Sequence, residues 1–201
     1  MATRVMIADD HAILRYGVRS LIEAEGSFSV IAEIESVDAL KQQAVELQPD
    51  IILLDYLMPG GDAFSVAMYV KRRYPKIKIL FYTAIDSPAI LTKMNNSCVD
   101  GVLLKQDPSS DLIKALISIR NHNRYISNRV QECSAHAKVD LTTREVQVLH
   151  MILMGFRRST IAEKLEISPE TIKTHRKNLM RKLEVQNITE LVHRAKEFSL
   201  Y

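Results

Sequence analysis

Five side chains in the first half of the chain have the types and spacing that phosphoryl transfer requires. Asp9 and Asp10 are adjacent, Asp55 follows an apolar run, and Thr83 and Lys105 come later in the chain. Three carboxylates that gather in one place repel one another and favour a hard divalent cation such as Mg²⁺. Asp55 could then attack phosphorus and become an acyl phosphate, with Lys105 and the Thr83 hydroxyl bound to the phosphoryl oxygens.

An alternation of strand and helix patterns over residues 3–120 would bring these side chains together. Short apolar runs that are typical of strands are Arg4–Ala8, Ser29–Ile34, Asp50–Leu54, Lys78–Tyr82 and Gly101–Leu104. Helical patterns lie between and after them, at residues 12–24, 37–47, 62–74, 87–96 and 109–121. Five such units in series predict an α/β fold, with a five-stranded parallel sheet covered by helices on both faces.

Ligands of an open α/β sheet bind outside the carboxyl ends of its strands. Asp9, Asp55, Thr83 and Lys105 are each expected at such a strand end. Any one of them alone is better explained as a helix cap or a solvated turn residue. Their coincidence at one edge of the sheet favours a functional site.

The second half of the chain has no strand pattern and is expected to be all helical. Polar residues dominate from 127 to 139, so we interpret the chain as residues 1–122, a linker at 123–138, and a second domain at 139–201. The signals for four helix starts are Thr142 with Glu145, Ser159 or Thr160, Ser168-Pro169-Glu170, and Asn187 with Glu190. These signals predict a compact four-helix unit.

The helix expected at residues 169–183 has one apolar side and one cationic side. Ile172, Leu179 and Leu183 share the apolar side, which should be buried. The polar side carries Glu170, Lys173, Thr174, Lys177, Asn178 and Arg181. A helix of this kind that follows another helix after a short turn is typical of a helix-turn-helix unit, whose second helix enters the major groove of DNA. A solvated helix with surface ion pairs would explain the charge pattern alone equally well.

Charge and cysteine content limit the possible partners and location. Residues 125–201 contain 13 Lys and Arg against 9 Asp and Glu, whereas residues 1–124 contain 14 against 15. The basic second half favours a polyanion partner, although weakly. Two cysteines in no motif, no secretory signal and no apolar run of membrane-spanning length favour a cytoplasmic protein without a membrane partner.

The first half resembles a response-regulator receiver domain, which has a flavodoxin-like fold. The stretches that carry the resemblance are Ala8–His11, Leu54–Gly60, Thr83-Ala84 and Gly101–Lys105. The resemblance implies that Asp55 accepts the phosphoryl group, that Asp10 binds Mg²⁺ with help from Asp9, and that the backbone carbonyl of Leu57 completes the metal site. It also implies a histidine kinase as phosphodonor, for which small phosphodonors can substitute. Val102 and Ala63 depart from the family pattern, which usually has an aromatic switch residue and a glycine at these positions.

Residues 140–196 resemble a LuxR-type DNA-binding domain of the NarL/FixJ family. The matching stretches include Leu141–Leu149, Ile161–Leu165, Ile167–His175 and Arg181–Leu183. The resemblance implies that Lys173, Thr174 and Lys177 read base edges or adjoining phosphates. The residues that it implies for contacts with the DNA backbone are His175, Asn178, Arg181, Arg157, Arg158 and Ser159. His175 lies toward the buried side of its helix, so a structural role is an equal alternative. Within the family, residues 176–183 resemble SsrB- and EsrB-type virulence regulators.

Together these observations predict a two-component response regulator rather than an enzyme. It would bind promoter DNA as a homodimer through its last helix, at about residues 187–198, and would act on RNA polymerase. Three alternatives stay open: a haloacid-dehalogenase-type phosphatase, a DNA-binding protein whose receiver is never phosphorylated, and a purely structural protein. Leu57 argues against the phosphatase, which needs a second Asp at that position. The structural alternative leaves both the acidic cluster and the cationic helix unexplained.

Overall fold

The computed structural model describes residues 2–134 and 141–197. The strands are β1 (Thr3–Ala8), β2 (Phe28–Ile34), β3 (Ile51–Leu54), β4 (Lys78–Thr83), β5 (Gly101–Leu104) and β6 (Tyr125–Ile126). They form one parallel sheet in the order β2-β1-β3-β4-β5-β6. The helices of this part are α1 (Ala12–Ala24), α2 (Val37–Leu47), α3 (Ala63–Arg73), α4 (Pro88–Asn95), α5 (Ser109–Arg120) and α6 (Asn128–Ser134).

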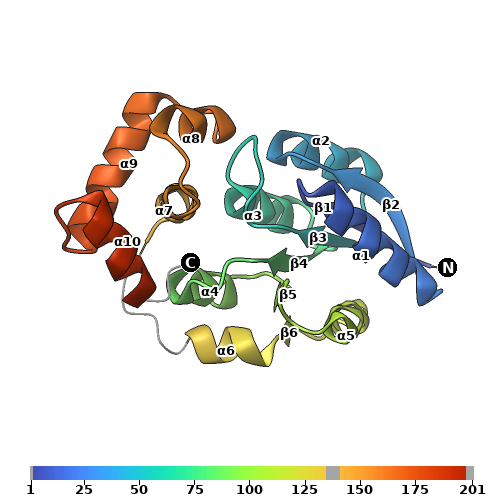
Figure 1. The fold of residues 1–201 in the computed structure, drawn as a ribbon. Coiled ribbons are helices and arrows are strands. Elements are labelled where there is room, and N and C mark those ends of the chain that lie inside the picture. The colour runs from blue at the N-terminus through green and yellow to red at the C-terminus, as the bar shows by residue number, and fades with distance from the viewer. Residues whose placement is uncertain (1, 135–140, 198–201) are drawn as a thin grey trace.

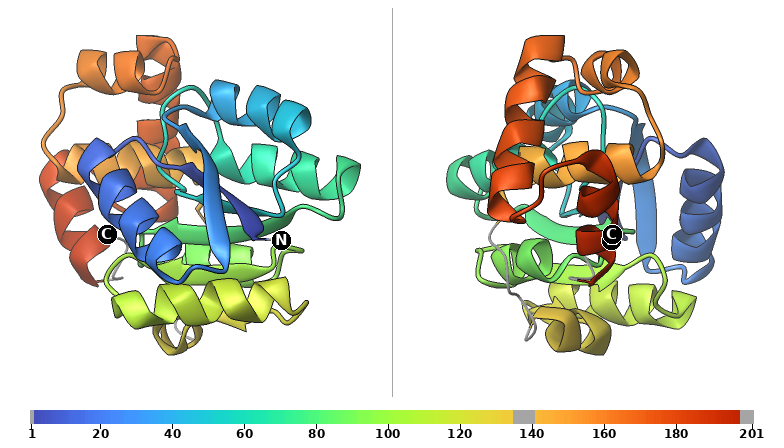
Figure 2. Two further views of the ribbon diagram at one scale, coloured as in Figure 1. Left: turned by 90° about the vertical axis from the view of Figure 1, so that its right-hand side faces the viewer. Right: turned by 60° about the vertical axis from the view of Figure 1, so that its left-hand side comes forward.

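Helices cover both faces of the sheet, as the repeated βα pattern predicts (Figures 1 and 2). Apolar residues of α1 and α5, such as Ile22 and Leu116, pack with Leu53 of β3 on one face. Residues of α2, α3 and α4 pack with alternate strand residues, such as Leu54, on the other face. All four residues of β3 are buried because a central strand contacts helices on both sides. This packing fixes the strand end that precedes Asp55.

Two elements were not predicted: the strand β6 and the helix α6, which lie in the predicted linker. β6 pairs with β5 through Gly101 and Tyr125, so the sheet has six strands rather than five. A strand of two residues is too short for an alternating pattern to show. α6 packs against α4 and β5, where Val130 is fully buried. Residues 135–138 of the predicted linker lie outside the described part of the chain.

The second half forms α7 (Thr143–Leu153), α8 (Arg158–Lys164), α9 (Pro169–Lys182) and α10 (Ile188–Glu197). Three of the predicted starts are confirmed: the Thr142–Glu145 capping box, Ser168 bound to the Thr171 amide, and Asn187 bound to the Glu190 amide. The predicted start of α8 at Ser159 or Thr160 was wrong. That helix begins at Arg158 after Arg157, which makes no side-chain capping bond.

The predicted apolar side of α9 is confirmed. Ile172 and Leu179 are fully buried and Leu183 nearly so, and α9 packs against α7 and α8. Leu191 and Ala195 of α10 are also buried, which gives both residues a place in the core. The four helices therefore share one core, which positions the polar side of α9.

The second half lies against one side of the first half (Figure 1). The Lys93 ammonium of α4 donates a hydrogen bond to the Thr143 hydroxyl of α7, with Nζ and Oγ1 2.8 Å apart. The apolar core continues from the α2–α4 face of the sheet into the second half, through residues such as Met58 and Val146. Within the described residues, no helix is both long enough and apolar enough to cross a bilayer.

Candidate functional site

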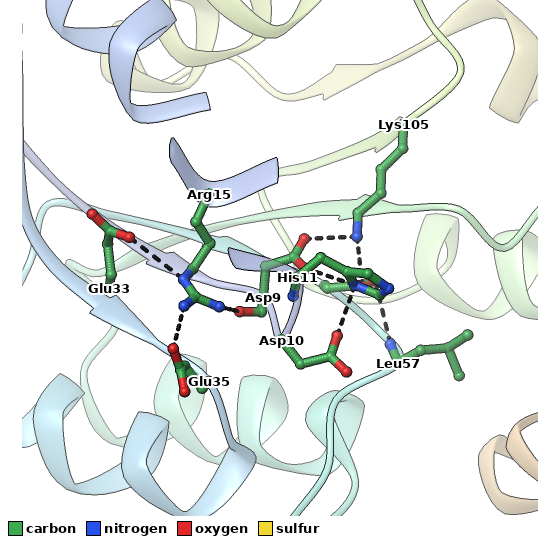
Figure 3. A network of polar contacts seen from close by, with 9 residues as sticks. Asp9, Asp10, His11, Arg15, Glu33, Glu35, Leu57 and Lys105 are labelled. Carbon is green, nitrogen blue, oxygen red and sulfur yellow. Dashed lines mark hydrogen bonds and ion pairs between the residues drawn. The ribbon is translucent and has the colours of Figure 1, made fainter. Parts of the chain in front are cut away.

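The predicted acidic cluster forms at the carboxyl edge of the sheet (Figure 3). Asp9 follows β1 and Asp55 follows β3; both are buried, while Asp10 is exposed. Lys105 follows β5, and its Nζ lies 2.6 Å from Asp9 Oδ2 and 2.7 Å from Asp55 Oδ2. The order of the strands brings these side chains together, because β1, β3, β4 and β5 are successive neighbours.

The charges of the cluster depend on one another. Burial lowers the pKa of Lys105, but the carboxylates of Asp55 and Asp9 outweigh that effect, and the net shift is upward. The amine therefore keeps its proton at neutral pH. Burial raises the pKa of the Asp55 carboxyl, and Lys105 opposes the rise. The single ammonium is shared by two buried carboxylates, which leaves net negative charge for a cation to neutralise.

His11 belongs to the same cluster, although the sequence reasoning did not assign it a role. Its Nδ1 lies 2.9 Å from Asp10 Oδ1 and 3.2 Å from Asp9 Oδ1. One possible ligand atom from each of Asp9, Asp10, His11 and Asp55 lies within 4.8 Å of the others. Three carboxylates are the oxygen donors that Mg²⁺ prefers, so the residues fit that ion. The adjacency of His11 to the aspartates was the only signal in the sequence.

Leu57 and Thr83 also lie at the cluster, but their polar groups form hydrogen bonds within the protein. The Leu57 amide donates to Asp55 Oδ1 over 3.3 Å, so it holds the candidate nucleophile. The Thr83 hydroxyl is fully buried and accepts a hydrogen bond from the Ile85 amide at 3.2 Å. It would have to turn away from Ile85 or use its own proton to bind a phosphoryl oxygen.

Arg15 is a further residue that the sequence reasoning missed. It is buried on α1 and donates to the backbone carbonyl of Asp9. Its guanidinium also forms ion pairs with Glu33 and Glu35 at the end of β2 (Figure 3). The side chain thus ties α1 and β2 to the strand end that carries Asp9. No local pattern marks it, because its partners are distant in the sequence.

The segment after Asp55 packs against the second half of the chain. Tyr56 is fully buried, and its ring packs beside Phe81 with the ring centroids 6.1 Å apart. Burial raises the pKa of its hydroxyl far above the ordinary value, and the side chain of Thr143 of α7 opposes the rise. Val102, where the family commonly has an aromatic residue, is buried in β5. A buried aromatic therefore lies beside Asp55 rather than on β5.

The polar side of α9 is exposed, as a DNA-reading helix requires. Lys173, Thr174, Lys177 and Arg181 are exposed, whereas His175 and Asn178 are half-buried. Lys173 pairs with Glu170 over 3.2 Å, an exposed contact that costs little to break. Burial lowers the pKa of His175, so the ring is neutral at pH 7. Arg157, Arg158 and Ser159 are exposed at the start of α8.

Two family models match separate parts of the chain. Residues 5–117 match the model of the response regulator receiver domain, and residues 139–195 match that of bacterial regulatory proteins of the luxR family. The chain belongs to the NarL/FixJ family of response regulators. In this family, a receiver domain controls a DNA-binding domain by phosphorylation, and its members are transcription regulators rather than typical enzymes.

Individual response regulators match along nearly the whole chain. The transcriptional regulatory protein RcsB of Escherichia coli K12 is 33% identical over an alignment of 198 positions, which covers 94% of this chain and 92% of RcsB. The response regulator VraR of Staphylococcus saprophyticus is 31% identical over 100% of this chain and 99% of VraR.

Solved structures of RcsB have the same fold. One from Salmonella typhimurium has a TM-score of 0.81 at 32% identity, over 98% of this chain and 99% of that one. The structure of an RcsB–DNA complex has a TM-score of 0.65 at 31% identity, over 98% of both chains.

Proposed function

We propose that this response regulator is phosphorylated on Asp55, with Mg²⁺ held by Asp9, Asp10, Asp55 and the backbone carbonyl of Leu57. The observation that carries the proposal is the contact of the Lys105 ammonium with Asp55 Oδ2 at 2.7 Å inside a cluster of three carboxylates. When bound, Mg²⁺ would supply positive charge that neutralises the phosphoryl oxygens. Lys105 would move from Asp55 to those oxygens, and the Leu57 amide would keep Asp55 Oδ1 in place.

We further propose that α9 enters the major groove of promoter DNA. Its exposed Lys173, Thr174 and Lys177 would read base edges or adjoining phosphates. The Thr174 hydroxyl now donates to the Glu170 carbonyl over 3.2 Å and would turn to reach a base. The residues proposed to bind the DNA backbone are His175, Asn178, Arg181, Arg157, Arg158 and Ser159. Because α9 contacts α7 and α8 through its apolar side, its polar side is open to an approaching DNA duplex.

The remaining partners are inferred from family membership. RcsB has been seen as dimers bound to DNA, and we propose that this protein also binds DNA as a homodimer. In the cytoplasm, a histidine kinase would supply the phosphoryl group. The DNA-bound regulator would then act on RNA polymerase. Regulation of virulence genes stays a prediction from the resemblance of residues 176–183 to regulators of that kind.

The test measures DNA binding and phosphorylation together. The wild type, Asp55→Ala and the control Glu46→Gln, which changes an exposed carboxylate on α2, are each treated with acetyl phosphate and Mg²⁺. Intact mass should show one added phosphoryl group on the wild type and the control but none on Asp55→Ala. Affinity for a selected promoter, measured at one fixed salt concentration, should rise with phosphorylation only in the first two proteins.

Two other results would change the proposal. Modification of Asp55→Ala would place the phosphoryl group on another residue. Equal DNA affinity of all three proteins with and without acetyl phosphate would leave α9 as the DNA-reading helix but remove Asp55 as a control on affinity. That second result would favour a receiver that acts without phosphorylation.

A further inference from the structure

The side chain of Arg15 holds a backbone group inside the candidate metal site (Figure 3). Arg15 is 5% exposed, and its Nη1 donates to the backbone carbonyl of Asp9 over 2.5 Å. That carbonyl belongs to the peptide group that joins Asp9 to Asp10. Because a peptide group is planar, a donor that fixes its oxygen also fixes its plane. The plane in turn restricts the direction in which the backbone of Asp10 presents its side chain.

The two aspartates differ in how firmly their own carboxylates are held. The buried Asp9 places Oδ2 2.6 Å from the Lys105 ammonium, and its Oδ1 accepts the His11 amide at 2.9 Å. The side chain of Asp10 is 37% exposed, and its Oδ1 lies 2.9 Å from Nδ1 of His11, a ring that is itself 68% exposed. An exposed contact of this kind holds a side chain weakly. The position of the Asp10 carboxylate therefore depends strongly on the backbone that carries it.

Arg15 is itself held in place by two acidic residues at the end of β2. Its Nη2 forms an ion pair with Glu35, and its Nε lies 3.4 Å from Glu33 Oε2. The planar guanidinium thus has a partner on each of its three nitrogens, with the Asp9 carbonyl as the third. A lysine ammonium is a single point charge and cannot reproduce this fork of donors. The arrangement transmits the position of β2 to the Asp9–Asp10 peptide group.

We propose that Arg15 is a positioning residue for the metal site, which fixes the Asp9–Asp10 peptide group and thereby orients the Asp10 carboxylate for Mg²⁺. The inference rests on the proposed Mg²⁺ site. It assigns to Arg15 an effect on metal affinity that acts through Asp10, although the guanidinium is not a ligand and carries a charge of the same sign as the metal.

The charge of Arg15 and its positioning role predict opposite effects on Mg²⁺ affinity. A nearby cation repels a bound metal ion, so removal of the guanidinium should tighten Mg²⁺ binding if charge alone mattered. It would also leave Glu33 and Glu35 without this counter-ion, which adds to the attraction. Loss of a residue that orients a metal ligand typically weakens metal binding by 10- to 100-fold. The sign of the change therefore separates the two roles.

Three variants of the whole chain test the proposal. Arg15→Met removes the donors but keeps an unbranched stem, and Arg15→Lys keeps the charge. The control Arg19→Met removes the same charge from the same helix, because Arg19 pairs with Glu33 Oε1 over 3.0 Å and with Glu23 over 3.3 Å. The Kd of Mg²⁺ is measured by calorimetry on the unphosphorylated proteins at one salt concentration. We expect Kd to rise roughly tenfold in Arg15→Met and roughly 3- to 10-fold in Arg15→Lys, with no rise in the control.

Two further measurements show whether Arg15 acts through Asp10. In a double-mutant cycle, Arg15→Met should add little to the rise in Kd that Asp10→Asn already causes, because the carboxylate to be oriented is gone. The backbone amide of Asp10 lies in the peptide group that Arg15 fixes, so its NMR signal in metal-free protein should move in Arg15→Met and Arg15→Lys but not in the control. If Arg15→Met does not fold, Arg15→Lys and this signal still decide.

Phosphorylation by acetyl phosphate gives a kinetic readout of the same role. The Mg²⁺ concentration for half-maximal rate should rise in the Arg15 variants, whereas the rate at saturating Mg²⁺ should stay close to that of the wild type. Unchanged or tighter Mg²⁺ binding in both Arg15 variants, an equal loss in Arg19→Met, or full additivity with Asp10→Asn would overturn the inference and leave the proposed function standing. A wild type that binds no Mg²⁺ would overturn both.

Discussion

The ion pair between Glu145 and Lys182 joins the DNA-reading helix α9 to α7, and its loss should loosen the DNA-binding domain measurably. The Glu145 carboxylate is 3% exposed and lies 2.8 Å from the Lys182 ammonium. The same Oε2 accepts the Thr142 amide at 2.8 Å, so one carboxylate both caps α7 and holds α9. The substitution Glu145→Gln keeps an acceptor for the Thr142 amide but removes the charge.

The expected loss of stability follows from the exposure of the two partners. Removal of one partner from a fully buried ion pair costs about 3–5 kcal/mol. Lys182 is 25% exposed here, so its ammonium stays partly hydrated, and the side-chain amide introduced by the substitution would retain the cap. We therefore expect a cost of about 1–2 kcal/mol, or roughly 5–15 °C in the Tm of a domain of this size.

The contribution of the Glu145 carboxylate to stability should be lost at low pH. Burial would raise the pKa of Glu145, but hydrogen bonds from Lys182 and the Thr142 amide outweigh it, and the pKa lies below the ordinary 4.5. The carboxylate therefore stabilises the folded state fully above the ordinary pKa, and this stabilisation disappears as the pH falls through the lowered pKa of the folded state. The stability difference between wild type and Glu145→Gln should be constant from about pH 6 to 8 and should shrink in acid.

Urea unfolding followed through the amide NMR signals of α7 and α9 measures this domain without the receiver transition. A double-mutant cycle with Lys182→Met separates the pair from the other contacts of each residue, and a coupling of about 1 kcal/mol is expected. A coupling near zero at neutral pH, or a stability difference that persists unchanged in acid, would refute the reasoning.

Three further predictions concern the metal site, the DNA contact and the core. Asp10→Asn should weaken Mg²⁺ binding about tenfold or more, measured by calorimetry, without a change in DNA affinity of the unphosphorylated protein. Lys177→Ala should reduce the slope of log affinity against log salt by about one if this exposed amine binds a phosphate; an unchanged slope would remove it from the interface. Ile172→Ala should cost about 2–5 kcal/mol in the DNA-binding domain, because the side chain is fully buried, and should abolish DNA binding while Asp55 still accepts a phosphoryl group.

Local patterns in the sequence were sufficient for most of the fold. The run Ile51–Leu54 is apolar at every position because β3 is covered on both faces. These four residues alone therefore predict a buried central strand. The Thr142–Glu145 capping box also depends on residues only three positions apart. The start of α8 was misplaced because Arg157 caps that helix without a side-chain bond, and such a boundary leaves no signal.

The candidate phosphorylation site was predictable for a topological reason. Asp9, Asp55 and Lys105 each follow directly after a strand, and a parallel sheet brings the carboxyl ends of its strands to one edge whatever the details of packing. The sequence by itself therefore determined the two domain types, the acidic cluster and the apolar side of α9.

Only the tertiary structure decided the contacts between residues that are distant in the chain. β6 forms by pairing with the edge strand β5. Arg15 binds the backbone carbonyl of Asp9 and forms an ion pair with Glu33 of β2. Lys93 donates a hydrogen bond across the domain interface to Thr143, which is fifty positions away in the sequence. Periodicity and capping report on the surroundings of one element, whereas these contacts depend on how whole elements and domains pack together.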